Sequence, residues 1–475
     1  MNKVFLLLII IVSLSATAQE KGNKWDLRKC VDYATKNNIS VKQADVQARI
    51  SALQFKQAKY YQYPTSSFST SAGYQFGRSI DPTTNEYTTT QLISQGLTLQ
   101  GGAEIYNWGK LKNNTIAAQL SAKAALVDVE KVANDVSLNV ATYYLQVLAS
   151  KEQINICTVQ IAQTKEQLDE TDKKVKAGAL PELNLVEIEA QLATDSSNYI
   201  SAQATYEQNL LSLEGLLNVD AAKPFDIEET PVEKIPLEPL TELQPDIIYQ
   251  IALNNQPLQR SNALKTKSAQ KSILSNKASL YPSLSGYYSL ASTYNNQAVD
   301  INQSGITNTP YGQVNVAGTN YTVYIPYPNY TYSKTNYTDQ LNENFRESVG
   351  VTLSVPIFNN GQYRINYEQA ILNLKNMQLQ QEQSDQTLKL NIYTAYSNVI
   401  NALQKFNAGK HTVESSQKAY DYALKRYDIG LLSTLDLLTN QNNLEKAKIQ
   451  QVANEYDYVF KMKLLEFYKG QGLKL

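Results

Sequence analysis

The side chains that most often do chemistry in proteins are scarce in this chain. There is one histidine, His411, and there are two cysteines, Cys30 and Cys157. A lone histidine on the flank of a charged helical stretch is typical of a solvated surface position, not of a general acid or base. The chain has no Cys/His metal spacing, no nucleophile elbow and no phosphate loop. The sequence therefore predicts neither an enzyme nor a bound cofactor or metal.

The two cysteines fall in helical patterns and leave two possibilities open. They could form a disulfide in an oxidising compartment. They could instead be two buried free thiols, which is the simpler interpretation because unpaired cysteine behaves as a small apolar residue.

Composition narrows the class of protein. The formal net charge is -1, so the chain has no large basic field and no nucleic-acid partner is expected. There are 33 tyrosines against 10 phenylalanines and 2 tryptophans. Tyrosine suits membrane interfaces and solvated β surfaces, because its ring is apolar and its hydroxyl is wet.

The first residues have the pattern of an export signal. An apolar run follows Lys3, and an Ala-x-Ala cleavage site ends at Ala18. Residues 1–18 are therefore predicted to be a signal peptide. No cysteine follows the cleavage site, so no lipid attachment is expected there.

The longest predicted element is a helical rod of about 68 residues, which corresponds to about 100 Å. It runs from 110 to 177, and apolar residues recur in it every seven positions, as in a left-handed coiled coil: Val140, Val147, Ile154, Ile161, Leu168 and Val175. The same row returns 252 residues later, from Ile392 to Tyr427, so the chain is a tandem duplication.

Each rod is predicted to turn back into a shorter return helix. Glycine followed by proline stops the first rod, and Gly430 stops the second. The predicted hairpins span 110–217, with a tip at 178–181, and 362–468, with a tip at 430–433.

Period-2 patterns predict two strands in each half, near 66–77 and 91–105 and near 283–292 and 347–357. The first structural repeat is assigned to 19–219 and the second to 246–475. A connector rich in proline and glutamate joins them at 220–245. Residues 293–345, rich in Tyr, Asn and Thr, are expected to form a long polar loop.

Four membrane-length strands cannot close a barrel, and open strand edges in lipid leave backbone groups unsatisfied. Several copies of the chain must therefore complete the barrel. Rods of about 100 Å cannot fold into that membrane and must project from it. These elements together predict a duct.

At this point the sequence resembles the TolC family of outer-membrane efflux proteins over essentially the whole mature chain. The paired halves, the segment 350–358 before the second rod and the tip segment 427–438 carry the resemblance. It implies a mainly helical chain in a TolC-like homotrimer. Its β-barrel would have about 12 strands, four per chain, and would continue into a periplasmic α-helical coiled-coil barrel. It also implies an outer-membrane location and a passive exit duct for efflux or type I secretion. The implied partners are outer-membrane lipid, a periplasmic membrane-fusion adaptor and an inner-membrane pump of the RND, ABC or MFS type.

The resemblance also suggests roles for residues at the hairpin tips. The candidates for adaptor contact are Gly178, Ala179, Leu180, Gly430, Leu431 and Ser433. The same residues are good turn formers, and both roles can hold together.

A periplasmic gate is the second role that the resemblance implies. Asp436 stands where the family places an acid, Asn184 and Glu187 occupy the matching first-half positions, and Tyr427 matches a tip tyrosine. A ring of carboxylates would select cations. The family's second acid is Thr439 here, so the predicted ring is weak. Asp436 could equally be a favourable partner for the helix dipole, and Tyr427 could simply continue the coiled-coil row.

A trimeric surface stalk or adhesin that binds a target through residues 293–345 is the alternative. A stalk needs no paired hairpin tips, whereas here helices flank every pair of strands. The sequence therefore favours the duct.

Overall fold

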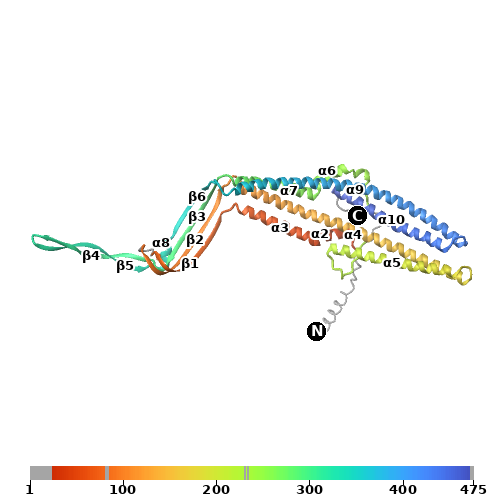
Figure 1. Cartoon of the computed structure of the whole chain (residues 1–475), viewed down its shortest axis with the longest axis horizontal. Coiled ribbons are helices and arrows are strands. Elements are labelled where there is room, and N and C mark those ends of the chain that lie inside the picture. The colour runs from red at the N-terminus through yellow and green to blue at the C-terminus, as the bar shows by residue number, and fades with distance from the viewer. Residues whose placement is uncertain (1–23, 81–84, 229–231, 233–234, 471–475) are drawn as a thin grey trace, which may run out of the picture. The chain divides into compact units, whose positions relative to one another are not determined.

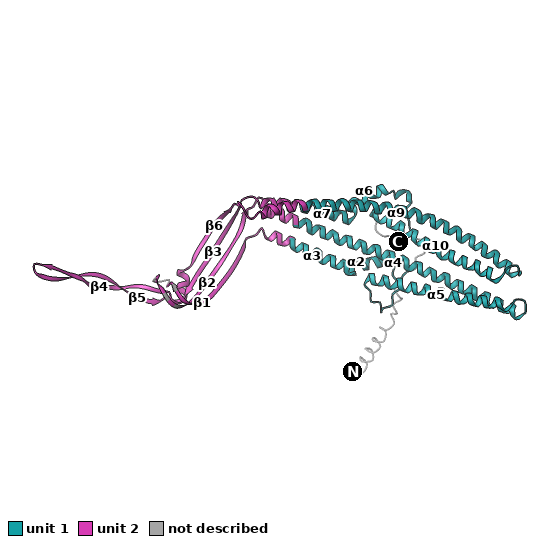
Figure 2. Ribbon diagram, in the orientation of Figure 1, with its two compact units in different colours: residues 1–54, 118–269, 373–475 teal, residues 55–117, 270–372 magenta. Residues whose placement is uncertain are grey.

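The computed structural model describes residues 24–80, 85–228, 232 and 235–470, so the signal peptide expected at 1–18 lies outside the described residues. The chain divides into two compact units (Figure 2). Unit 1 holds residues 1–54, 118–269 and 373–475, and unit 2 holds residues 55–117 and 270–372. Among the described residues, no helix combines the length and apolar character needed to cross a bilayer.

The helices repeat the same order twice (Figure 1). The first half has α2 (Leu27–Asn37), α3 (Ile39–Tyr60), α4 (Lys110–Lys176) and α5 (Glu182–Leu217), and the second has α6 (Pro245–Asn255), α7 (Pro257–Ala278), α9 (Gln362–Asp428) and α10 (Thr434–Lys469). Helices α4 and α9 each have 67 residues, and α5 and α10 each have 36. Equal lengths in the two halves agree with the predicted duplication.

The core of unit 1 lies along the faces of these helices. The predicted seven-residue row is fully buried at Val140 and Val147 and half-buried from Ile154 to Leu168. A second row on α4, also spaced by seven, is buried at Ser150, Cys157, Thr164 and Thr171. The two rows together make the seam of a coiled coil. Because the second row is small and mostly polar, the hydrophobic pattern alone did not indicate it.

The two cysteines are free and buried, which confirms the interpretation as free thiols. Burial raises the pKa of the Cys30 thiol to about 12, so it stays protonated and unreactive at neutral pH. His411 is 82% exposed, as predicted for a solvated helix flank.

The connector between the halves is more ordered than an extended linker. Residue 25 pairs in parallel with Ile227, and a short 3-10 helix, η2, spans Leu240–Glu242. Leu243 is fully buried, and the buried Lys463 donates a hydrogen bond to the carbonyl of Pro236. The described residues of the connector therefore pack against the helices of unit 1.

Unit 2 contains an antiparallel sheet in the order β1-β2-β3-β6. Its strands are β1 (Thr65–Ile80), β2 (Tyr87–Tyr106), β3 (Ser283–Asn295) and β6 (Arg346–Ser354). These are the four predicted strands with shifted ends. Strands β1 and β2 extend to Ile80 and from Tyr87, beyond the predicted limits at 77 and 91. Strand β6 stops before Pro356, which cannot donate to a strand ladder.

The prediction of a long polar loop at 293–345 was wrong. This segment holds β4 (Val299–Val316), β5 (Thr319–Lys334) and a short helix, α8 (Tyr337–Glu343). Ala317 and Gly318 turn the hairpin with φ values of 49° and 87°, as tight two-residue hairpin turns require. The abundant Tyr, Thr and Val favour strands, but the polar composition concealed that preference.

Candidate functional site

The two helical hairpins turn with the same backbone geometry. At the first turn, Gly178 has a φ of 75°, and the amide of Ala179 donates to the carbonyl of Lys174. At the second, Gly430 has a φ of 73°, and the amide of Leu431 donates to the carbonyl of Arg426. This is the Schellman ending of a helix, which favours glycine. The turn role of both glycines therefore rests on backbone geometry.

Both turns lie at the same end of unit 1 (Figure 1). Ala179 is exposed, and Leu180 is half-buried. The second turn is more apolar, with Ile429 68% and Leu431 65% exposed. Large apolar side chains that a chain leaves in water at adjacent positions are typical of an interaction surface. Ile429 was not among the sequence candidates, although its place beside Gly430 could have indicated it.

Asp436 is exposed and belongs to a helix cap. The Ser433 hydroxyl donates to the Asp436 carboxylate at 2.7 Å, and the amide of Asp436 donates back to the Ser433 oxygen at 3.2 Å. The arrangement stabilises the start of α10. Within the described residues of one chain, no hydrogen bond or ion pair joins Asp436 to Asn184 or Glu187, both of which are half-buried.

Tyr427 lies where the two hairpins meet. Its hydroxyl is 3.4 Å from the Thr171 hydroxyl on α4, and the Lys174 ammonium lies 5.6 Å from the centre of its ring. One heptad earlier, the Gln167 amide donates to the Tyr420 hydroxyl at 2.9 Å. These contacts tie α9 to α4, so Tyr427 serves both the coiled-coil row and the link between hairpins.

A buried polar layer joins three helices farther along the hairpins. The Thr164 hydroxyl donates to the Asp195 carboxylate at 2.5 Å, and the Gln441 amide donates to the Thr164 oxygen at 3.1 Å. Gln191 donates to Asp195 at 2.7 Å and exchanges hydrogen bonds with Asn442. Side-chain hydrogen bonds therefore join α4, α5 and α10, in addition to buried apolar residues such as Ile188 and Leu437. The sequence candidates did not include these residues.

A second carboxylate, Glu445, is 4% exposed in this layer. Burial raises its pKa, and the nearby charge of Asp195 raises that pKa further, while Asn198 and Lys446 act in the opposite direction. The Glu445 Oε1 atom has no hydrogen-bond partner. Burial and the nearby Asp195 charge thus make the ionised form of Glu445 less favourable in this layer than the protonated form.

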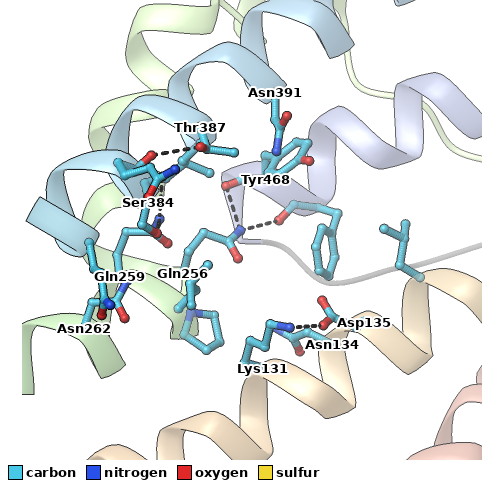
Figure 3. Close-up of a pocket in the computed structure, with 17 residues that line it drawn as sticks. Lys131, Asn134, Asp135, Gln256, Gln259, Asn262, Ser384, Thr387, Asn391 and Tyr468 are labelled. Atoms are coloured by element: carbon cyan, nitrogen blue, oxygen red, sulfur yellow. Dashed lines mark hydrogen bonds and ion pairs between the residues drawn. The ribbon is translucent and has the colours of Figure 1, made fainter. Parts of the chain in front are cut away.

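A cavity of about 440 Å³ lies between α4, α7, α9 and the end of α10 (Figure 3). Amide side chains line much of it, and Gln256 uses its amide to donate to the carbonyls of Phe467 and Tyr468. Lys131 and Asp135 pair with each other at 2.7 Å. Its lining has no nucleophile beside a base, and the described residues contain no cluster suited to a metal ion.

Duplicated long helical hairpins and an antiparallel sheet whose two outer edges no described strand covers define the class of TolC-like outer-membrane channels. The chain belongs to the outer membrane efflux protein family, whose model matches residues 31–219 and 248–467. It is thus an outer-membrane protein with its helical part in the periplasm, and its family is one of channels and not of enzymes.

Known relatives agree with this assignment. The chain is 27% identical to TolC of Escherichia coli over 115 residues, which are 24% of this chain and only 23% of TolC. Among solved structures, the CmeC outer membrane channel of Campylobacter jejuni is 22% identical, with a TM-score of 0.70 over 94% of this chain and 86% of that one. VceC of Vibrio cholerae is 14% identical, with a TM-score of 0.71 over 94% and 97%. CusC gives a TM-score of 0.74 at 16% identity, over 94% and 92%. These likenesses establish the fold.

Proposed function

We propose that three copies of this chain form a passive exit duct through the outer membrane for a tripartite efflux or type I secretion system. The observation that carries the proposal is the four-stranded sheet, in which no strand among the described residues lies beside the outer edges of β1 and β6. An unpaired edge in lipid leaves its backbone groups without partners, so another sheet must cover it. Three such sheets supply about 12 strands, a size at which membrane barrels close.

The sequence contains no phosphate-binding loop that could couple transport to nucleotide hydrolysis. Transport therefore needs an inner-membrane pump of the RND, ABC or MFS type, coupled through a periplasmic adaptor. The hairpin turns are the proposed adaptor surface, because Ile429 and Leu431 offer apolar side chains to solvent beside the Gly430 turn.

The same end of the hairpins is the proposed gate. Three copies would bring three Asp436 carboxylates around one axis, and Glu187 and Asn184 stand at the matching first-half positions. Tyr427 supports closure through its contact with Thr171 on the other hairpin.

Single-channel recording tests the duct. The purified full-length trimer, added to a planar bilayer, is expected to give discrete current steps, and the same sample should elute as a trimer from size exclusion in detergent. A trimer that never conducts, even after neutralisation of Asp436, would favour the surface-stalk alternative. A stable single-chain particle without lipid or detergent would contradict both.

A further inference from the structure

The β4–β5 hairpin has a composition unlike that of the rest of the chain. Between Asp300 and Lys334 it has no charged side chain. Strand β4 spans 18 residues and β5 spans 16, and they pair antiparallel from Val299↔Lys334 to Val316↔Thr319. Because β4 begins four residues after β3 ends, the base of the hairpin is tied to the four-stranded sheet.

The hairpin has no core of its own. Among the described strands, β4 and β5 pair with each other and with no other, and nearly all of their residues are exposed. A two-stranded hairpin that buries nothing is marginally stable in water. A long, uncharged and exposed hairpin therefore indicates a surface that a partner covers.

Both faces of this hairpin carry exposed large apolar side chains among uncharged polar ones. Residues opposite one another in the pairing share a face, so the register sorts the side chains into two sets. The first face carries Val314, Tyr321, Val323, Ile325 and Tyr327, and the second face carries Ile301, Ile306, Tyr324, Tyr330 and Tyr332. All ten side chains are at least 39% exposed.

The edges of the hairpin are poorer binding surfaces than the faces. Pro326 and Pro328 are two residues apart on β5, so their backbone nitrogens point to the same side of the strand. Proline within a sheet occurs where that side faces away from the partner strand, so the outer edge of β5 lacks two N–H donors. Irregular pairing at Gln303/Gly305 and Pro310/Gly312 breaks the ladder on β4. These features block strand addition.

We infer that the hairpins of three copies pack together, the first face of each against the second face of its neighbour, and form an extension of the duct beyond the four-stranded sheets. This inference rests on the proposed trimer. In a ring of three, each copy touches two neighbours through two different surfaces. The hairpin has two faces that each carry exposed apolar side chains, which is the number that such a ring requires.

Other copies of the chain are the partner that the observations favour. Closure of the barrel through β1 and β6 would hold the three hairpin bases together at a high effective concentration, so little further entropy is lost when the faces meet. The absence of charge between Asp300 and Lys334 removes repulsion between identical hairpins. A neutral polysaccharide, which also stacks on tyrosine rings, is the competing occupant.

Cysteine crosslinking of the full-length trimer tests the inference. Tyr327→Cys on the first face is combined in turn with Ile306→Cys, Tyr324→Cys or Tyr330→Cys on the second. After mild oxidation, at least one pair should shift the chain to a covalent trimer on a non-reducing gel. The native cysteines are buried and stay in place. The matched control places both cysteines on the first face, as Tyr321→Cys with Tyr327→Cys, and should stay at the size of one chain.

The outcomes separate this inference from the proposed function. Intact trimers that conduct but give no covalent trimer with any of the three pairs would overturn the hairpin packing and leave the duct standing. Loss of maleimide labelling at Tyr327→Cys on addition of a neutral polysaccharide, again without crosslinking, would assign the faces to that ligand. Absence of trimers in the unmodified protein would remove the proposed function itself.

Discussion

At the scale of single residues, some positions in the helical hairpin turns are set by backbone geometry and others are available to bind a partner. Gly178 and Gly430 adopt left-handed conformations with open space around them, so their identity follows from the turn. Leu431 has no such constraint and is 65% exposed. A large apolar side chain in that position contributes more to a partner surface than to its own chain.

We expect Leu431→Ser to weaken binding of the adaptor by roughly 10- to 100-fold, because burial of a leucine in an interface is worth roughly 1.5–3 kcal/mol. Co-purification of the adaptor with the trimer measures the effect. The matched control is Leu390→Ser, since Leu390 is 66% exposed on α9, far from the turn. Equal loss of binding in both variants would mean that the turn has no special role.

Asp436 tests the gate at the same scale. We expect Asp436→Asn to lower the preference for cations over anions by about twofold, because a charge at about 8 Å is worth about 0.5 kcal/mol in water. Asparagine can keep the cap with Ser433, so stability should hardly change. Reversal potentials in a salt gradient give the selectivity. Glu189→Gln, which neutralises an exposed acid on α5, is the control, and an equal shift there would argue against a ring at Asp436.

At the scale of elements, β1 and β2 pair closely because glycine stands at Gly101. A Cβ atom there would lie 2.1 Å from the Thr65 carbonyl and 2.8 Å from the Tyr288 ring. The Tyr288 hydroxyl donates to Ser66 at 2.7 Å, so this ring ties β3 to β1 across β2.

We therefore expect Gly101→Ala to destabilise the sheet by about 1–3 kcal/mol, the range for an overpacked site. Thermal dissociation of the trimer in detergent would report it. Gly73→Ala is the control, because its Cβ would meet only the Ser94 hydroxyl at 3.9 Å. A Gly101→Ala trimer as stable as the Gly73→Ala trimer would contradict the close approach.

The polar layer between the hairpins should make stability depend on pH. Folding raises the pKa of Glu445 above its ordinary value of 4.5, so the folded chain holds this proton more tightly than the unfolded one. Stability is then fully present below that ordinary value and falls as pH rises through the folded pKa. Because burial destabilises only the ionised form of Glu445, removal of its charge should increase the stability of the folded chain at neutral pH.

We expect Glu445→Gln to raise the free energy of unfolding at pH 7.5 by about 1 kcal/mol, the scale of one unsatisfied buried polar group. The same substitution should flatten the pH dependence between pH 4 and 8. Thermal melts across that range supply the measurement. Glu189→Gln, which removes an exposed charge, should leave the slope unchanged, and a Glu445→Gln slope equal to that of the wild type would rule out this carboxylate.

At the scale of the whole molecule, the proposed trimer assembles through the outer edges of β1 and β6, which no described strand of the same chain covers, and the β4–β5 hairpin is proposed to add to it. At the base of the β4–β5 hairpin, the Thr335 amide donates a hydrogen bond to the Ala298 carbonyl at 3.3 Å. This contact lies outside residues 299–334, so it can remain when those residues are removed.

Replacement of residues 299–334 by an Asn-Gly turn should leave the trimer and its current in place. The trimer should dissociate at a lower temperature than the wild type, since the hairpin contacts between copies are lost. Single-channel recording and thermal dissociation of the same sample give both quantities. Failure to form trimers would show that the hairpin, and not the sheet edge, drives assembly.

The sequence by itself determined the long helices, their duplication, the four strands of the sheet and the turns at Gly178 and Gly430. Each of these leaves a local signal, because helical and strand periods and the needs of glycine are properties of neighbouring residues. Only the tertiary structure placed Thr164, Asp195 and Gln441 in one buried layer, since polar residues on three helices show no common period. It also decided that residues 299–334 form a hairpin, because the pairing of β4 with β5 is a relation between segments that composition does not record.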